Sequence, residues 1–327
     1  MQAVGYNGTE FVNFEKPVTD PLGFDLLVEV RAISINPIDA KIKQTITTKP
    51  KTPVILGFDA CGVVLAVGDK TTLFKVGDEV FYAGDMTRDG SNAEQQLVDE
   101  RIVGIKPKSL DFSKAAALPL TSITAWESLF HRLKISSKDK DKTLLLIGAA
   151  GGVGSMAIQF AKRIVSMNVV ATASRDESRV WCEKMGADTV IDHHNLSDQF
   201  KDNKLTAPDF ILCMGDPDMY FETMAQIIAP QGSICLLANA TRDYDINLLK
   251  AKSITLVWEM MFTRSMFQTK DMIKQHDILN EVSKLVDDQK IQTTLQDDIS
   301  PINAQSVNQA HATIEKRKMI GKLVISN

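Results

Sequence analysis

The sequence predicts an α/β protein with two domains, one rich in β-strands and one built on a doubly wound parallel sheet. With 327 residues, the chain is long enough for two separate cores. Short β-type runs between Gly, Pro and Asp turns fill the first part, up to about Pro107. From Thr143 to about Phe262, strand-type and helix-type runs alternate, which is typical of right-handed β-α-β crossovers and a parallel sheet.

The β-rich part shows little helical periodicity. Its clearest strand-type runs are residues 26–33, 61–67, 79–82 and 96–98. After Pro119, apolar residues recur at helical spacing from Ser122 to Leu133. We expect this helix to lead the chain into the second domain.

The second domain opens on a glycine turn. Residues 144–155 read LLLIGAAGGVGS, and the strand-type run 169–175 follows after a helical stretch. Such a β-α-β unit is the half-site that binds a dinucleotide, with the phosphates at the helix N-terminus. Gly151 would let the backbone approach a pyrophosphate, and Gly154 would let the helix pack closely on the strand. Ala149 replaces the first glycine of the G-x-G-x-x-G pattern.

We therefore predict that the dinucleotide phosphates are held by the residues of the turn, which are Ala150, Gly151, Gly152, Val153 and Gly154. The alternative is a plain tight turn without a ligand.

The end of the second strand indicates which dinucleotide is bound. An NAD site places Asp or Glu there, about 20 residues after the turn. Here Ser174 and Arg175 take that place, and an arginine can pair with a 2′-phosphate that an acid would repel. The sequence thus favours NADP(H); alternatively, Arg175 is a solvated surface charge. Asp176 and Glu177 suit the first turn of the next helix.

The remaining segments complete the domain assignment. The later strand-type runs are 190–191, 210–213, 233–237 and 254–258. Residues 254–262 form a candidate edge strand with an apolar row, which predicts a homodimer paired through this edge. The last part, 271–327, holds two helical patterns and a closing strand at 321–325. We expect it to return to the first domain, which gives domains of 1–122 with 268–327 and of 123–267.

Composition excludes several classes of protein. The formal net charge of −4 offers no basic field for nucleic acid or an anionic membrane. No apolar stretch reaches the length of about 20 residues that a bilayer span requires, and the start of the chain lacks a secretory leader pattern. The four cysteines form no C-x-x-C pair. We expect a cytoplasmic protein.

Five motifs in order resemble the medium-chain dehydrogenase/reductase superfamily over essentially the whole chain. They are residues 34–39 (SINPID), 56–62 (LGFDACG), 75–80 (KVGDEV), 119–126 (PLTSITAW) and the glycine turn. The chain is most similar to the zinc-free quinone oxidoreductase branch, including bacterial zinc-type alcohol dehydrogenase-like proteins. The resemblance implies a GroES-like β domain beside a Rossmann domain, with NAD(P) bound between them.

The same resemblance indicates whether the chain can bind the zinc ions of its relatives. Zinc alcohol dehydrogenases of this superfamily carry a cysteine where this chain has Asn36, a His-Glu pair at Phe58-Asp59, and a second cysteine near Leu120. A catalytic zinc needs about three N, S or O ligands from the protein. The four-cysteine loop of the structural zinc is also missing between Tyr82 and Ala93. We therefore expect no metal.

Without zinc, the simplest acceptor is one that spreads its own negative charge. Hydride addition to a quinone or an α,β-unsaturated carbonyl places the charge on a distant oxygen, whereas a simple ketone needs a Lewis acid. By resemblance, Asn36 could orient the nicotinamide ribose or the substrate and Asp39 could buttress its loop; an Asx turn around Pro37 is the alternative. Thr121 is a candidate donor or helix cap, and Tyr82 a candidate donor or core residue.

Three further residues are candidate cofactor contacts. His193 falls where quinone oxidoreductases carry a tyrosine near the adenosine phosphate, Asn239 follows a strand at the ligand edge, and Arg317 precedes the closing strand. His193 and Arg317 could equally be surface residues. Two other functions stay open: a catalytically idle NADPH-binding protein with a structural or regulatory role, and an alcohol dehydrogenase with an unusual zinc site.

Overall fold

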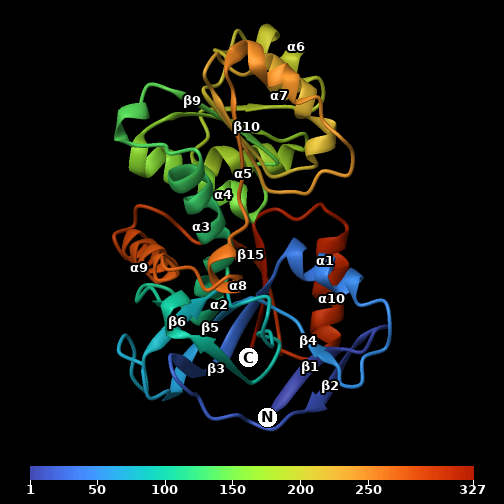
Figure 1. Ribbon diagram of the computed structural model, residues 1–327, viewed down its shortest axis with the longest axis vertical. Coiled ribbons are helices and arrows are strands. Elements are labelled where there is room, and N and C mark those ends of the chain that lie inside the picture. The colour runs from blue at the N-terminus through green and yellow to red at the C-terminus, as the bar shows by residue number, and fades with distance from the viewer. The chain divides into compact units, whose positions relative to one another are not determined.

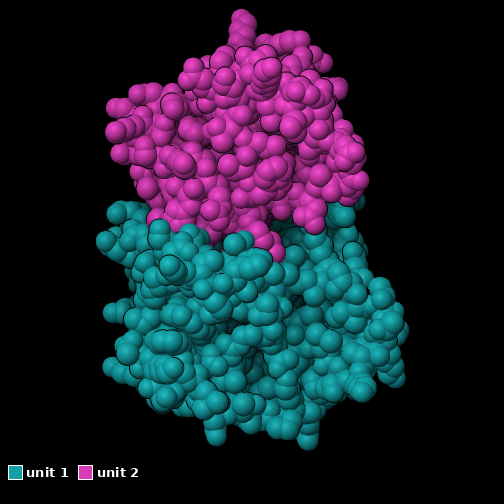
Figure 2. Space-filling view, viewed as in Figure 1, with its two compact units in different colours: residues 1–123, 262–327 teal, residues 124–261 magenta.

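The computed structural model describes all residues from Met1 to Asn327. The chain divides into two compact units, coloured separately in Figure 2: residues 1–123 with 262–327, and residues 124–261. The sequence predicts that the second unit extends to residue 267, but the chain returns to the first unit earlier, at Phe262. None of the helices has the length and apolar character that a bilayer crossing requires.

The first unit is built on two sheets. The larger has seven strands in the order β15-β16-β3-β5-β6-β8, with β7 also paired to β3, and the smaller has the order β2-β1-β4. Only β15 and β16 run parallel among these pairs. The strands are β1 (Gln2–Tyr6), β2 (Phe11–Glu15), β3 (Asp25–Ile35), β4 (Val54–Ile55), β5 (Asp59–Val67), β6 (Glu79–Tyr82), β7 (Gln95–Asp99), β8 (Val103–Ile105), β15 (Leu295–Ile299) and β16 (Lys322–Ser326).

Strand β3 organises this unit because its apolar run is long enough to pair with three neighbours. Val28, Val30 and Ile33 are buried in the core cluster of the unit. The register sets Leu323 of β16 opposite Ile35, and Asp59 of β5 opposite Ser34. The ends of three strands that lie far apart in the sequence therefore meet beside residue 36.

Helices cover the first unit outside its sheets. They are α1 (Pro37–Thr45), α2 (Phe112–Ala116), α8 (Thr263–Met266), α9 (Lys274–Asp287) and α10 (Ala304–Glu315), and the chain passes into the second unit within α3 (Pro119–Trp126). Figure 1 shows α1 and α10 side by side, where the Lys43 ammonium pairs with the Glu315 carboxylate. Helix α1 was not expected from the sequence, although Pro37 stands at a first-turn position that suits proline.

The second unit holds a six-stranded, all-parallel sheet in the order β11-β10-β9-β12-β13-β14. This is the doubly wound order: successive strands are added on one side of β9 as far as β11, and then on its other side from β12 to β14. The strands are β9 (Thr143–Ile147), β10 (Asn168–Thr172), β11 (Thr189–Ile191), β12 (Phe210–Cys213), β13 (Ser233–Leu236) and β14 (Thr255–Trp258). All five predicted strand positions of this sheet after the glycine turn are confirmed.

The helices of the second unit connect these strands. They are α4 (Gly152–Phe160), α5 (Asp176–Met185), α6 (Leu196–Asp202) and α7 (Phe221–Ile227). Helix α4 continues into a wider π-helical turn at Ala161–Val165, and α3 into another at Glu127–Arg132. Strands β9 and β12 are buried at every position, which is typical of a parallel sheet covered on both faces.

Candidate functional site

The glycine turn begins directly at the end of β9. Gly148 has a φ of +84°, a conformation that favours glycine, and its N–H donates to the Thr172 hydroxyl at 3.0 Å. This residue makes the tight turn that the first glycine of the fingerprint usually makes. The alanine at position 149 is therefore compensated one residue earlier, which the sequence pattern did not reveal.

The next two glycines of the turn have different surroundings. A methyl group on Gly154 would lie 2.3 Å from the Ala149 carbonyl oxygen, so this residue must be glycine for helix α4 to pack on the turn. A methyl group on Gly151 would meet only the Gly148 carbonyl oxygen, at 3.9 Å, and would otherwise point into open space. Gly151 precedes α4 as its N-cap. The structure thus leaves room for a ligand where a phosphate would approach the helix.

The predicted phosphate-binding residues lie together at this helix start. Ala150, Gly151, Gly152 and Val153 are partly exposed, whereas α4 is buried from Gly154 onward. The first backbone N–H groups of a helix have no partner within the helix, and the helix dipole favours an anion there. These residues fit the pyrophosphate of a dinucleotide.

The end of β10 carries no acidic residue. Ser174 and Arg175 are exposed, and Arg175 is the N-cap of α5 with extended backbone angles. Asp176 and Glu177 form the first turn of α5, as the sequence indicated. A 2′-phosphate at this strand end would meet an arginine and the start of a helix, both of which favour an anion.

Two further candidates follow two other strands of the same sheet, β11 and β13. His193 follows β11, is half-buried, and lies with its Nδ1 3.3 Å from the Tyr220 hydroxyl. Burial, and then the charge of His194, lower the pKa of His193. Asn239 is exposed in the loop after β13. Because all these strands are parallel, their carboxyl ends meet at one edge, the usual ligand edge of such a sheet.

In the first unit, a buried polar cluster forms beside the start of α1. It consists of Asn36, Asp59 and Lys322, which are exposed to 1%, 0% and 4%. The Lys322 ammonium lies 3.0 Å from Asp59 Oδ2 and 2.5 Å from Asn36 Oδ1, and also donates to the Ile35 carbonyl. Asn36 Nδ2 donates to Asp59 Oδ2 at 2.9 Å. We call these three residues the Lys322 cluster.

The Lys322 cluster is closed by two more hydrogen bonds. The Leu120 N–H donates to Asp59 Oδ1 at 2.7 Å, and the second N–H of the Asn36 amide donates to the Ser34 carbonyl at 3.2 Å. Both donor groups of Asn36 are therefore used within the protein. In this structure Asn36 holds Asp59 and Lys322 in place and has no donor left for a ligand.

Asp39 lies next to this cluster and is fully buried. Its Oδ2 accepts the Asn36 backbone N–H at 2.7 Å, while its Oδ1 has no hydrogen-bond partner. Burial raises the pKa of Asp39 to about 7, against the lowering effects of the Asn36 N–H and of Lys322. The carboxyl thus supports the backbone at residue 36 and exchanges its proton near neutral pH.

The other candidates of this unit are Tyr82, Thr121 and Arg317. Tyr82 is the last residue of β6 and belongs to the core, which was one of the two alternatives for it, and its hydroxyl has no hydrogen-bond partner. The Thr121 hydroxyl donates to the Leu118 carbonyl at 3.1 Å, so its hydrogen is already used within the protein and does not cap a helix. Arg317 is exposed in the turn between α10 and β16, with a φ of +54°.

The residues at the zinc-ligand positions do not fit a catalytic zinc ion. Phe58 and Leu120 offer no ligand atom, and the Asn36 amide and the Asp59 carboxylate are occupied by hydrogen bonds. The positive charge beside Asp59 comes from the Lys322 ammonium. The four cysteines, at positions 61, 182, 213 and 235, all lie outside the segment between Tyr82 and Ala93, so that segment offers no thiolate ligand for a structural zinc.

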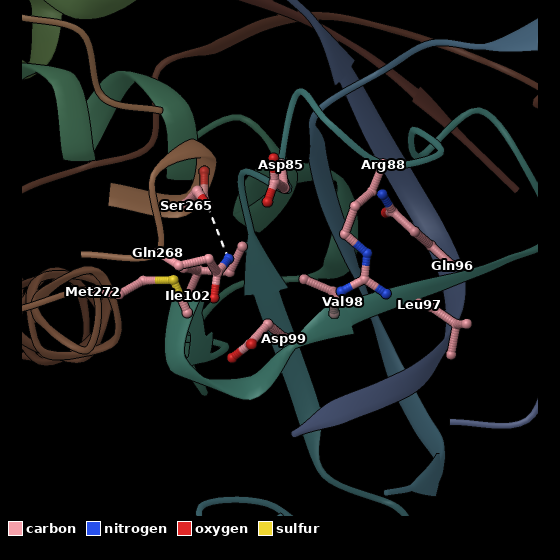
Figure 3. A pocket seen from close by; sticks show the side chains of 10 residues that line it. All are labelled: Asp85, Arg88, Gln96, Leu97, Val98, Asp99, Ile102, Ser265, Gln268 and Met272. Atoms are coloured by element: carbon pink, nitrogen blue, oxygen red, sulfur yellow. Dashed lines mark hydrogen bonds between the residues drawn. The ribbon is translucent and has the colours of Figure 1, made fainter. Parts of the chain in front are cut away.

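A small polar cavity lies in the first unit near that shortened loop. Its volume is about 20 Å³, enough for a water molecule. Figure 3 shows Asp85, Arg88 and Asp99 around it, with the Gln268 amide donating to the Ser265 carbonyl. The Arg88 guanidinium is held by both oxygens of Asp25, at 2.7 and 2.9 Å. The cavity is too small for an organic substrate.

Comparison with known proteins agrees with this architecture. A family profile described as "Alcohol dehydrogenase GroES-like domain" matches residues 23–117, and one described as "Zinc-binding dehydrogenase" matches residues 152–281. The expected GroES-like and Rossmann-type pair of domains is thereby confirmed.

Two curated relatives cover most of the chain. A zinc-type alcohol dehydrogenase-like protein of Staphylococcus aureus (strain MSSA476) is 44% identical over 323 residues, which are 98% of this chain and 96% of the relative. The chloroplastic NADPH-dependent alkenal/one oxidoreductase of Arabidopsis thaliana is 32% identical over 246 residues, which are 72% of this chain and 61% of that protein.

Solved structures show the same fold. A protein of Rhizobium etli CFN 42, described as a candidate zinc-dependent alcohol dehydrogenase, is 46% identical, has a TM-score of 0.94, and covers 100% of this chain and 98% of its own. The Escherichia coli quinone oxidoreductase complexed with NADPH has a TM-score of 0.85 and covers both chains fully, and at 22% identity the likeness concerns the fold alone. On these matches, the chain belongs to the medium-chain dehydrogenase/reductase superfamily and is an oxidoreductase.

Proposed function

We propose that this protein transfers hydride from NADPH to a quinone or an α,β-unsaturated carbonyl compound without the help of a metal ion. The observation that carries the proposal is the Lys322 cluster. It stands where zinc-dependent members of the family hold their metal, and its one positive charge is already balanced by Asp59 at 3.0 Å. On this proposal, the site works without a Lewis acid.

The missing Lewis acid restricts the acceptor. Reduction of a simple ketone creates a localised alkoxide, and a metal ion stabilises such charge by several kcal/mol. A conjugated acceptor spreads the charge to an oxygen several bonds away, where hydrogen-bond donors or water can stabilise it. Quinones and enones are therefore the substrates that this set of side chains suits best.

The cofactor would be held by the second unit. We assign the pyrophosphate to the start of α4, at Ala150, Gly151, Gly152, Val153 and Gly154, where the open space beside Gly151 supports the assignment. When bound, the dinucleotide supplies the hydride. Ser174 and Arg175 would receive the 2′-phosphate, since no acid stands at the end of β10 to repel it. His193 and Asn239 would contact the cofactor from the ends of β11 and β13, and Arg317 would add a phosphate contact.

In the first unit, we assign positioning roles to Asn36 and Asp39. Asp39 fixes the backbone of residue 36 through the 2.7 Å bond, and Asn36 links Asp59 to Lys322. We give Thr121 and Tyr82 a smaller part in the reaction than Asn36 and Asp39. The Thr121 hydroxyl already donates to the Leu118 carbonyl, and the Tyr82 hydroxyl is buried in the core. The name of the Arabidopsis relative, an NADPH-dependent alkenal/one oxidoreductase, supports the enone class of acceptor.

An acceptor screen tests the proposal. Consumption of NADPH is followed with a panel of quinones, enones, simple ketones and aldehydes, and the zinc content of the purified protein is measured after dialysis. We expect turnover of conjugated acceptors only, in protein that contains no stoichiometric zinc. Tight NADPH binding without turnover of any acceptor would favour an idle structural or regulatory protein. Stoichiometric zinc with activity on simple alcohols would favour an alcohol dehydrogenase.

A further inference from the structure

Three metal-ligating side chains follow β11 in the second unit. Asp192, His193 and His194 each offer one ligand atom, and these atoms all lie within 4.8 Å of one another. Asp192 and His193 are partly exposed, and the His194 side chain is 66% exposed. None of the roles assigned above uses Asp192 or His194.

Each of the two imidazole rings has one nitrogen held by a neighbour. His194 Nδ1 lies 2.7 Å from Asp192 Oδ1, and the same carboxylate oxygen accepts the His194 backbone N–H at 2.9 Å. His193 Nδ1 lies 3.3 Å from the Tyr220 hydroxyl. Histidines that bind metals usually engage their second ring nitrogen in this way, with a carboxylate or another polar group that orients the ring.

The remaining ring nitrogen, Nε2, has no hydrogen bond in either residue. The ring centroids are 4.0 Å apart and the ring planes are tilted by 38°. In a tetrahedral zinc site the metal–nitrogen distances of about 2.0–2.1 Å set ligand atoms about 3.4 Å apart. The ligand atoms that the cluster offers lie within 4.8 Å of one another, which is near that spacing. The two histidines therefore form a nearly prepared pair of ligands.

We propose that His193 and His194 bind one Zn²⁺ ion or a similar transition metal ion. Asp192 and Tyr220 would orient the two rings. Imidazole ligands suit Zn²⁺, Ni²⁺ and Cu²⁺, whereas Mg²⁺ and Ca²⁺ prefer oxygen ligands. Two protein ligands leave the other coordination positions to water, so the ion is exchangeable and is separate from any catalytic zinc.

The position of this site gives the ion a regulatory effect. Because β10 and β11 are parallel neighbours, His193 lies at the same sheet edge as Arg175. On the proposed function, this edge receives the adenosine phosphate of NADPH. An ion held by His193 removes that residue from the cofactor, so zinc binding and NADPH binding oppose each other and each weakens the other by the same factor.

Direct metal titration tests the site independently of catalysis. The full chain, freed of metal by a chelator, is titrated with ZnCl₂ in a calorimeter, alongside His193→Asn, His194→Asn and the control His131→Asn, which removes a histidine elsewhere in the unit. We expect one Zn²⁺ per chain, affinity at least tenfold lower in the two site variants and unchanged in the control, and no binding of Mg²⁺. Absence of binding to the wild type, or wild-type affinity in either His193→Asn or His194→Asn, overturns the site.

A second experiment tests whether Zn²⁺ binding weakens NADPH binding. NADPH fluorescence is titrated with and without saturating Zn²⁺, in the wild type and in His194→Asn. We expect Zn²⁺ to weaken NADPH binding several-fold in the wild type and not in His194→Asn. An unchanged NADPH affinity overturns the regulatory effect and leaves the metal site standing. If NADPH does not bind at all, the proposed function fails while the calorimetric result still decides the metal site.

Discussion

The Lys322 ammonium lies 3.0 Å from Asp59 Oδ2, and both side chains are almost inaccessible to water. Removing one partner of such a buried pair leaves an uncompensated charge, at a cost of about 3–5 kcal/mol. Lys322→Met should therefore lower the stability of the first unit by about that amount. Chemical unfolding followed by circular dichroism measures the change.

A double variant separates loss of charge balance from loss of packing. Lys322→Met combined with Asp59→Asn removes both charges, so it should be more stable than Lys322→Met alone, because residues in contact are not additive. A double variant whose destabilisation equals the sum of the single effects would show that the two charges do not interact.

The Asp39 carboxyl should make stability depend on pH. Its pKa is raised to about 7 by burial, from 3.8. Below the lower value both the folded and the unfolded state hold the proton; between the two values only the folded state does. The stabilisation from this proton is thus complete below the lower value and is lost as the pH rises from about 3.8 to about 7, at about 1.4 kcal/mol per pH unit.

Asp39→Asn removes this dependence, because the amide stays neutral and can still accept the Asn36 N–H. The unfolding temperature of the variant minus that of the wild type should therefore increase between pH 5 and pH 8. Other titrating groups contribute equally to the unfolding temperatures of both proteins, so their contributions cancel in this difference. A constant difference would mean that Asp39 is ionised in the folded protein across this range.

Arg175 should discriminate between the two nicotinamide cofactors. A hydrogen bond to a charged group contributes about 1.5–3 kcal/mol, so Arg175→Ala should raise the Michaelis constant for NADPH by about 10- to 100-fold. The constant for NADH should change little, since that cofactor lacks the 2′-phosphate. Lys184→Ala, on the same helix, is the matched control. Equal effects on both cofactors would remove Arg175 from this role.

Two glycine variants distinguish a position that leaves room for the ligand, Gly151, from one that is needed for helix packing, Gly154. At Gly151 an added methyl group meets no close neighbour, so Gly151→Ala should keep the wild-type unfolding temperature while weakening NADPH binding. At Gly154 the methyl group would lie 2.3 Å from the Ala149 carbonyl oxygen, so Gly154→Ala should lower the unfolding temperature itself. Calorimetric scans and NADPH titrations check both. Normal NADPH affinity in Gly151→Ala would place the phosphates elsewhere.

The edge strand β14 leads to a prediction about assembly. It ends the sheet of the second unit, and Trp258 on it is 57% exposed. We predict a homodimer that pairs through residues 254–262, since an exposed apolar edge is a template for a second strand. Trp258→Lys should shift the wild-type dimer to monomer in analytical ultracentrifugation. A monomeric wild type would contradict the prediction, as would a variant that stays dimeric.

The sequence predicted the second unit well because its signals are local. Apolar strands such as Thr143–Ile147 are followed at once by their turns and helices, so the strand positions and the glycine turn could be read from neighbouring residues. Strand β15 was missed, because its sequence LQDDI is mostly polar and its pairing with β16 is set by the rest of the sheet.

The candidate site of the first unit was only partly predictable. Asn36 and Asp39 stood out in their motif, but Lys322 is separated from Asp59 by 263 positions and appeared only as part of a closing strand. Its role depends on the register of β16 against β3, which no local pattern encodes. Gly148 was overlooked because the fingerprint places its first glycine one residue later.

The position of β16 between β15 and β3 has a consequence for biosynthesis. The second unit is one continuous segment, residues 124–261, and can finish folding as soon as that segment has left the ribosome. The N-terminal segment must wait for residues 322–326 to fill the gap in its sheet, although it is made first. Nascent chains stalled before residue 322 should therefore carry a protease-resistant second unit and a protease-sensitive first one.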